Sequence, residues 1–274
     1  MQNNYPSKLL LFGEYLVLQQ GAALAIPDDR YQTKWVRKEE SSAEMLEYLE
    51  YLKNKELTES HLNLDRMERH LKNGWQLESD IPRHMGLGSS ASFIAAIYDR
   101  YKTMPDSEVS MDQLQQIFAT MEDFMHGKSS GFDPMPIYFR QPVLRKNNQS
   151  VLVKNPIPCL EYWDLELVDS GGPRGKAQWI DKFLKKIEAD KEFEDSIKTL
   201  TKVNNKMVEA VIKNERSVAE NLLTTFSNNQ FHLFEKWIPD TIKEQWEATN
   251  SNPGSVMKIL GAGGGGYFLR IHFN

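Results

Sequence analysis

A run of small residues directly precedes a helical pattern in the first half of the chain, and its residue types suit an anion. Apolar side chains recur at i, i+1, i+4 and i+8 from Phe93 to Tyr101, which predicts an amphipathic helix. Glycines let a ligand approach the backbone, and the N–H groups at a helix start attract phosphate. We therefore expect a phosphate at this helix start, although a plain glycine turn with a serine N-cap fits the same residues. The run consists of Gly86, Leu87, Gly88, Ser89, Ser90 and Ala91.

Three better-known motifs fit this run less well than a phosphate site at a helix start does. A P-loop requires a lysine after its second glycine, and none follows here. The run does not match the G-x-S-x-G nucleophile elbow either. Gly86, Gly88 and Ala91 do match the dinucleotide fingerprint G-x-G-x-x-A. That fingerprint follows a buried strand, whereas residues 75–82 alternate as a half-exposed strand does, so we rank dinucleotide binding low.

Two carboxylates form a second candidate for chemistry. Glu122 and His126 lie four residues apart in a helical pattern, so they share one helix face. We expect this helix to end at Gly127 and the following turn to present Asp133. One carboxylate could hold a metal and the other could accept a proton. Taken alone, the pattern is better explained by a solvated Glu122 and a turn residue Asp133.

A third candidate lies near the N-terminus, where Lys8 begins an apolar strand that Gly13 and Glu14 interrupt. A lysine in a buried strand needs a partner or a role. The alternative is that Lys8 extends its charged end to solvent from the end of the strand.

Composition limits the classes of function. A length of 274 residues suffices for one large or two modest domains. The net charge of -5 argues against a nucleic-acid-binding protein, but not against an anionic ligand. The single cysteine, Cys159, cannot form an internal disulfide, which fits a reducing cytosol. No apolar run approaches about 18 residues and no signal-peptide pattern opens the chain, so we expect a cytoplasmic protein without a membrane segment.

The elements around the candidates predict an α+β fold, with strands at both ends enclosing helices. Helices are expected at 42–56, at 61–73, after the small-residue run, after a capping box at Ser110 and Gln113, and from 177 to about 250. Strands are expected at 8–18 with the interruption at Gly13, from Ala23 to a stop at Pro27, at 31–38, at Trp75, in a hairpin of 136–144 and 150–156, at 162–169, and in two halves around the glycines of 261–266.

Three separated segments resemble motifs of the GHMP kinases, the galacto-, homoserine, mevalonate and phosphomevalonate kinases. Residues 8–27 resemble the N-terminal strand motif, "GLGSSAS" is similar to the phosphate-loop motif, and "KILGAGGGGYFL" is similar to the C-terminal glycine motif. They occur in the family's order and span most of the chain. The resemblance implies a two-domain α+β fold. A ribosomal-S5-like N-terminal domain over 1–158 would carry nucleotide binding and catalysis, and a ferredoxin-like C-terminal domain over 159–274 would lie on the substrate side.

Within the family, one spacing is similar to that of the mevalonate kinases, namely Glu-x-x-x-His-Gly-x-x-Ser-Gly-x-Asp. This resemblance implies that Asp133 is the catalytic base with Lys8 beside it. It implies that Glu122 and Ser90 are ligands of Mg²⁺. The positions of the spacing are occupied by Glu122, His126, Gly127, Ser130, Gly131 and Asp133.

The resemblance further implies ATP on the small-residue run and an acceptor held by side chains and glycines elsewhere. The expected function is ATP-dependent phosphorylation of an alcohol, most like mevalonate, by a monomer or homodimer that binds no nucleic acid and no membrane. Alternatives are a kinase for phosphomevalonate or a sugar, and an inactive relative that serves as a sensor or scaffold. The family's Arg-x-Thr pattern appears here without its threonine. The expected acceptor-binding residues are Glu14, His126, Arg174, Gly263 and Gly264.

Overall fold

The computed structural model of the chain describes residues 4–153, 156–172, 178–261 and 263–274. Its contacts divide the chain into two units. Unit 1 comprises Met1–Leu9, Ile26–Arg83 and Leu87–Val143, and unit 2 comprises Leu10–Ala25, His84–Gly86 and Leu144–Asn274. The domain boundary expected after residue 158 stays a prediction. The last segment of unit 1 ends at residue 143, and unit 2 includes the earlier segment 10–25.

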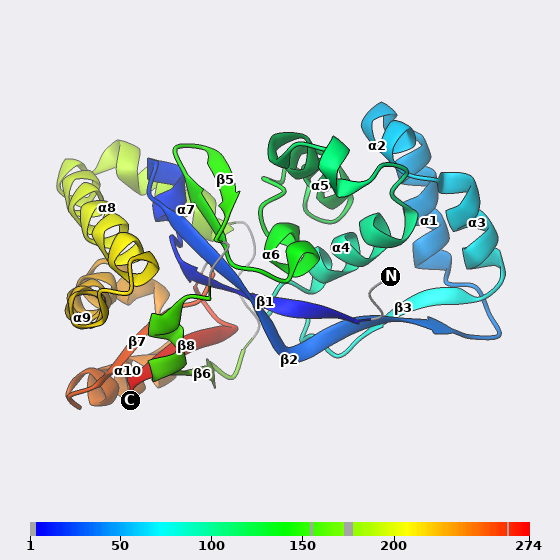
Figure 1. Cartoon of the computed structure of the whole chain (residues 1–274). Helices are drawn as coiled ribbons and strands as arrows, with labels where there is room; N and C mark the ends of the chain where they lie inside the picture. The colour runs from blue at the N-terminus through cyan, green and yellow to red at the C-terminus, as the bar shows by residue number, and fades with distance from the viewer. Residues whose placement is uncertain (1–3, 154–155, 173–177, 262) are drawn as a thin grey trace. The chain divides into compact units, whose positions relative to one another are not determined.

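Unit 1 is built of helices over one face of a sheet (Figure 1). The sheet has the strand order β1-β2-β4-β5, with β3 paired to β2. The end of β1 from Leu10, the start of β2 up to Ala25, the part of β4 after Val143 and all of β5 belong to unit 2. The pairing of β2 with β3 is antiparallel, from Thr33 opposite Ser79 to Arg37 opposite Trp75. A dinucleotide fingerprint needs a parallel βαβ unit instead, so β3 does not supply its context. The strands are β1 (Asn4–Phe12), β2 (Ala23–Arg37), β3 (Trp75–Ser79), β4 (Val143–Lys146) and β5 (Gln149–Leu152).

Four helices of unit 1, namely α1, α3, α4 and α5, lie where the sequence predicts them, whereas the sequence does not predict α2 and α6. The capping box is confirmed, because Ser110 accepts from the N–H of Gln113 and the Gln113 side chain bonds the N–H of Ser110. Gly127 ends that helix with a φ of 76°, a conformation that favours glycine. The helices are α1 (Ala43–Lys53), α2 (Glu56–His61), α3 (Leu64–Lys72), α4 (Ser89–Tyr101), α5 (Met111–His126) and α6 (Pro134–Phe139), with a 3-10 turn η2 (Asp106–Glu108).

Three expectations about strands are wrong. The strand from Ala23 does not stop at Pro27 but continues to Arg37, as a strand can where no ladder bond needs the missing N–H. The second half of the N-terminal pair is the 3-10 turn η1 (Leu16–Gln19), because Tyr15 and Gln20 take positive φ values of 59° and 60°. Residues 136–139 belong to α6 rather than to a hairpin arm, since Pro134 is placed at the helix start, where proline is favoured.

Unit 2 contains a three-stranded antiparallel sheet in the order β6-β8-β7, and α9 and α10 pack on β7. Tyr15 contributes its ring to an aromatic cluster with Phe183, Phe193, Phe234 and Trp237. The strands are β6 (Trp163–Asp169), β7 (Ser255–Ile259) and β8 (Tyr267–Phe273). The helices are α7 (Gln178–Ala189), α8 (Lys191–Ile212), α9 (Arg216–Phe234) and α10 (Asp240–Asn250), with 3-10 turns η3 (Pro158–Tyr162) and η4 (Glu235–Trp237).

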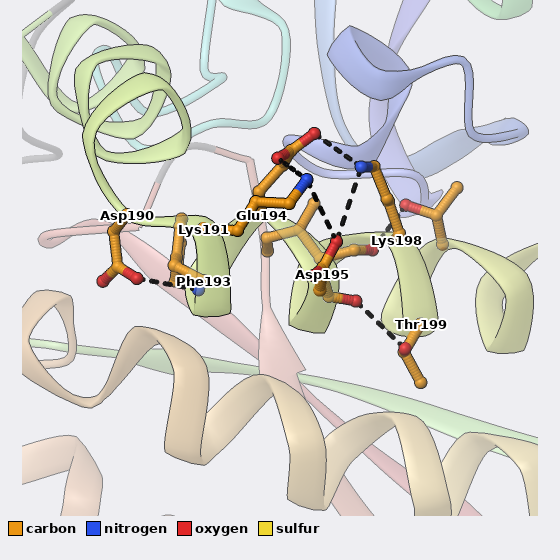
Figure 2. Close-up of polar contacts among 9 residues, drawn as sticks. Asp190, Lys191, Phe193, Glu194, Asp195, Lys198 and Thr199 are labelled. Atoms are coloured by element: carbon orange, nitrogen blue, oxygen red, sulfur yellow. Dashed lines mark hydrogen bonds and ion pairs between the residues drawn. The ribbon is translucent and has the colours of Figure 1, made fainter.

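Charges at the start of α8 satisfy one another (Figure 2). Asp190 caps the helix by accepting from the N–H of Phe193 at 3.0 Å. Lys191 and Lys198 both pair with Glu194, and their hydrogen bonds lower the pKa of Glu194 to about 2. Exposed pairs of this kind contribute little to stability. Because Glu194 neutralises Lys191 and Lys198, we interpret this face as a solvated surface rather than as a binding site for a second anion.

None of the helices that the structure describes is both long enough and apolar enough to cross a membrane.

Candidate active site

The two candidate catalytic side chains meet in unit 1. Nζ of Lys8 lies 2.9 Å from Oδ2 of Asp133. The Lys8 side chain is 4% exposed, whereas that of Asp133 is 43% exposed. Lys8 therefore does not extend to solvent from its strand end. Its buried ammonium is neutralised by a carboxylate that remains accessible to a ligand, which is an arrangement suited to moving a proton at a substrate hydroxyl.

The turn before α6 explains why the Asp133 carboxylate is available. Asp133 occupies the N-cap position with helical angles, and its side chain makes no capping hydrogen bond. The next residue, Pro134, has no N–H to be capped. Gly131 brings the chain back against α5, where a Cβ would overlap the backbone of Gln115 and Ala119. The sequence thus directs Asp133 away from the helix end and toward Lys8.

The small-residue run packs directly against Lys8. The N–H of Lys8 donates to the carbonyl of Leu87 at 2.9 Å. Gly88 forms the N-cap of α4 with a φ of 81°, and a Cβ there would lie 2.7 Å from Cγ of Lys8. The first turn of α4 contains no acidic residue, so the helix start keeps its positive end for an anion. Gly88 is therefore needed for close contact with Lys8 as well as for backbone access.

Gly88→Ala should lower turnover by about tenfold or more, because the new methyl group pushes the lysine stem and shifts its ammonium relative to Asp133. Steady-state turnover at saturating substrates measures this effect. The matched control is Gly171→Ala, where φ is 79° and a Cβ meets open space. If both variants lose turnover equally, backbone strain and not the Lys8 contact explains the effect.

Glu122 is buried rather than solvated, with a relative exposure of 4%. Burial, and next the charge of Asp133, raise the pKa of Glu122 to about 8, whereas the Ser129 hydrogen bond and Lys8 act in the opposite direction. Glu122 is therefore mostly protonated at neutral pH without a metal, and a bound divalent cation would favour its charged form. These residues fit Mg²⁺, which takes few protein oxygens. No group of three or more His, Cys, Asp or Glu that could hold a metal occurs in the described part of the chain.

Ser129 is a site residue that sequence reasoning missed. Its hydroxyl donates to Oε2 of Glu122 at 2.6 Å, and its N–H donates to the Asp123 carboxylate at 2.9 Å. The neighbouring Ser130, which matches the family spacing, accepts from the N–H of Phe132 at 3.4 Å. Because Ser129 and Ser130 are adjacent, the sequence does not show which of the two hydroxyl groups faces Glu122.

Ser129→Ala should raise the Mg²⁺ concentration needed for half-maximal rate by about 10–100-fold, the cost typical of losing a group that orients a metal ligand. A magnesium titration at fixed ATP tests this expectation. Ser130→Ala is the matched control and should change the requirement less. Equal shifts in both variants would show that the turn as a whole, not the Glu122 contact, sets the requirement.

The other expected site residues lie in different parts of the structure. Gly86 is placed in unit 2, and Ser90 is the second residue of α4 within unit 1. Glu14 is buried in unit 2 in an ion pair with Lys258, and its expected role at the substrate stays a prediction. Gly263 and Gly264 also lie in unit 2, with positive φ values of 63° and 73°. His126 is the last residue of α5, but its side chain is not described, and Arg174 lies outside the described residues.

The sequence and the fold agree on one family. Residues 47–141 match the family model for the GHMP kinases N terminal domain. A comparison with curated proteins finds no match. The chain thus contains a segment similar to the N-terminal domain of the GHMP kinases and has the GHMP kinase fold, which confirms the expected α+β class. Kinases of this family are ATP-dependent phosphotransferases.

Solved structures of several such kinases resemble the chain. Mevalonate kinase of Methanococcus jannaschii superposes with a TM-score of 0.67 at 21% identity, covering 99% of this chain and 90% of that one. Phosphomevalonate kinase of Streptococcus pneumoniae gives 0.66 at 16% identity, covering 99% and 91%. Galactokinase of Lactococcus lactis, solved with galactose, gives 0.63 at 15% identity, covering 99% and 85%. These superpositions establish a shared fold. At identities this low they do not show which acceptor substrate the protein uses.

Proposed function

We propose that this protein transfers the γ-phosphoryl group of ATP to the hydroxyl of mevalonate, giving 5-phosphomevalonate. The observation that carries the proposal is the contact between buried Lys8 and accessible Asp133 beside the glycine-rich start of α4. The similarity to mevalonate kinase structures and the spacing from Glu122 to Asp133 support this acceptor. All the catalytic side chains are present, which disfavours an inactive relative.

In the proposed reaction, Asp133 accepts the proton of the acceptor hydroxyl as the acceptor oxygen attacks the γ-phosphorus of ATP. The bond from that phosphorus to the bridging oxygen breaks, and ADP leaves. Lys8 stabilises the negative charge that develops on that oxygen. The N–H groups at the start of α4 hold the phosphates and orient them for in-line transfer. Glu122 and Ser90 would hold Mg²⁺, which would supply positive charge for the transferring phosphoryl group. Because phosphoryl transfer depends on positioning and charge more than on covalent help, these groups suffice.

The direct test is a coupled ADP-release assay with mevalonate, phosphomevalonate, homoserine and galactose as acceptors. We expect mevalonate to be used in preference, with no release in the absence of an acceptor. Activity with a sugar or with phosphomevalonate alone would overturn the acceptor and leave the kinase assignment. No ADP release with any acceptor, from a protein that binds ATP, would favour the inactive relative.

Arg174→Ala should raise the KM for mevalonate with little change in the KM for ATP. The reason is that a single arginine suits the one carboxylate of mevalonate through a bidentate pair. An interaction that is equally strong in the ground state and in the transition state affects KM but not kcat. Steady-state measurements of KM and kcat for mevalonate therefore test this expectation. Lys176→Ala is the control from the same segment. An unchanged KM for mevalonate in the arginine variant would place the carboxylate elsewhere.

A further inference from the structure

A second buried ion pair lies in unit 2, separate from Lys8 and Asp133. Nζ of Lys258 on β7 contacts Oε1 of Glu14, and it also donates to the carbonyl of Ile259 at 2.6 Å. Both side chains are 0% exposed in this pair. The partners are 244 residues apart in the sequence, so only the fold brings them together.

Stability alone does not account for this pair. Removing two charges from water costs as much as their attraction returns, and apolar side chains of similar volume often replace a buried pair without loss. Burial indeed lowers the pKa of Lys258, although the Glu14 charge acts in the opposite direction. A buried pair of this kind is better suited to fixing one arrangement of the segments that carry it.

Each partner lies close to glycine, which has no side chain to hold its own position. Glu14 lies between Gly13, with a φ of 105°, and Tyr15, with a φ of 59°. A Cβ at Gly13 would lie 2.6 Å from Cα of Ala23, so this turn fits closely against the start of β2. Lys258 precedes the glycine segment 261–266 by three residues, and β7 carries it directly into that segment.

Two glycines of that segment, Gly264 and Gly266, are held by backbone bonds. The N–H of Gly264 donates to the carbonyl of Trp237 at 3.0 Å, and the N–H of Gly266 donates to that of Gly172 at 2.8 Å. A Cβ at Gly264 would overlap the indole of Trp179. Gly264 and Gly266 therefore have defined backbone contacts but no side chains that could anchor them, so we expect their positions to depend also on what anchors β7.

We infer that Glu14 and Lys258 are positioning residues, whose ion pair fixes the turn at 13–15 to the end of β7 and thereby holds the glycine segment in the geometry used for substrate binding. The claim that the glycine segment contributes to substrate binding rests on the proposed function. Neither side chain touches the reacting atoms, since both are enclosed. Their effect reaches the reaction through the glycine backbone.

The test replaces both charges by an unbranched apolar side chain in the double variant Glu14→Met/Lys258→Met. Either single replacement leaves a buried charge unpaired, whereas the double replacement keeps the volume and removes both charges. We expect a Tm close to that of the unchanged protein, faster hydrogen exchange at the Gly264 and Gly266 amides, and a kcat/KM lower by about 10²-fold. A loss of this size is typical for a small misplacement of binding groups.

The matched control is Glu166→Met/Arg270→Met. Arg270 pairs with Glu166 at 2.9 Å on the same sheet, and it lies next to Leu269, the partner of Lys258 in the strand register, so it faces the opposite side. This control should leave amide exchange at Gly264 and Gly266 unchanged. If the double variant of Glu14 and Lys258 does not fold, Glu14→Asp provides the same comparison, because it keeps the charge and shortens its reach.

Normal amide exchange and normal kinetics in a folded double variant would overturn the inference. Faster exchange in the control variant as well would also overturn it, because the sheet as a whole would then hold the segment. The exchange measurement needs no activity. If the unchanged protein phosphorylates no acceptor, the proposed function fails while the exchange result still decides whether the pair positions the glycine segment.

Discussion

Asp133→Asn should lower turnover by about 10²–10⁴-fold while the affinity for ATP stays nearly unchanged. The amide keeps the shape of the carboxylate but cannot accept the hydroxyl proton, and it no longer neutralises Lys8 at 2.9 Å. Because the Asp133 side chain is 43% exposed, its loss should affect the base more than the fold. Single-turnover kinetics with preformed enzyme and ATP separate this chemical step from binding.

The matched control is Asp112→Asn, an exposed residue in the first turn of α5 that changes the net charge equally. It should leave turnover unchanged. Near-normal turnover in the Asp133 variant would remove this carboxylate from the chemistry. A large loss of ATP affinity in the same variant would instead assign Asp133 to nucleotide binding.

Glu122→Gln should raise the magnesium requirement at least as much as Ser129→Ala, since it removes the ligand rather than its orienting group. It should not destabilise the metal-free protein. The pKa of Glu122 is raised to about 8, whereas an unfolded glutamate titrates near about 4.3. Between these values the folded protein binds one more proton than the unfolded chain, so this group lowers the free energy of unfolding as pH rises.

The substitution to glutamine removes this dependence. Metal-free Glu122→Gln should melt close to the unchanged protein at pH 5 and above it at pH 9, because a pKa difference of one between the folded and unfolded states corresponds to about 1.4 kcal/mol. Thermal melts over this range in the presence of a chelator test the sign. A variant that melts lower at every pH, with an unchanged magnesium requirement, would show that Glu122 supports the fold instead.

Local signals predict the elements that hold the site. The capping box at Ser110 and the glycine at 127 set both ends of α5, and its apolar stripe is buried as expected at Leu114, Ile117 and Phe118. Residues 134–138 are all buried, so α6 shows no polar face and its period cannot be read from the sequence. A buried apolar run this short reads equally well as a strand.

Long-range contacts account for what sequence reasoning missed. Lys8 and Lys258 carry the same signal, a lysine within an apolar strand, yet nothing in the sequence near Lys258 points to its partner Glu14. Glu122 reads as solvated in the sequence because one carboxylate beside an apolar stripe does not reveal what covers it. Its burial and its contact with Ser129 depend on a turn whose path follows from the fold.

Because Leu10–Ala25 belongs to unit 2 while the residues on either side of it belong to unit 1, the order of synthesis does not match the order of assembly. When residue 143 leaves the ribosome, unit 1 has all its residues, but the apolar segment with Phe12, Leu16 and Leu24 still lacks its partners. Ala22 must wait for Asn204 and Asn205 on α8, and Glu14 must wait for Lys258. The half-made chain therefore exposes apolar surface and depends on protection from aggregation during translation.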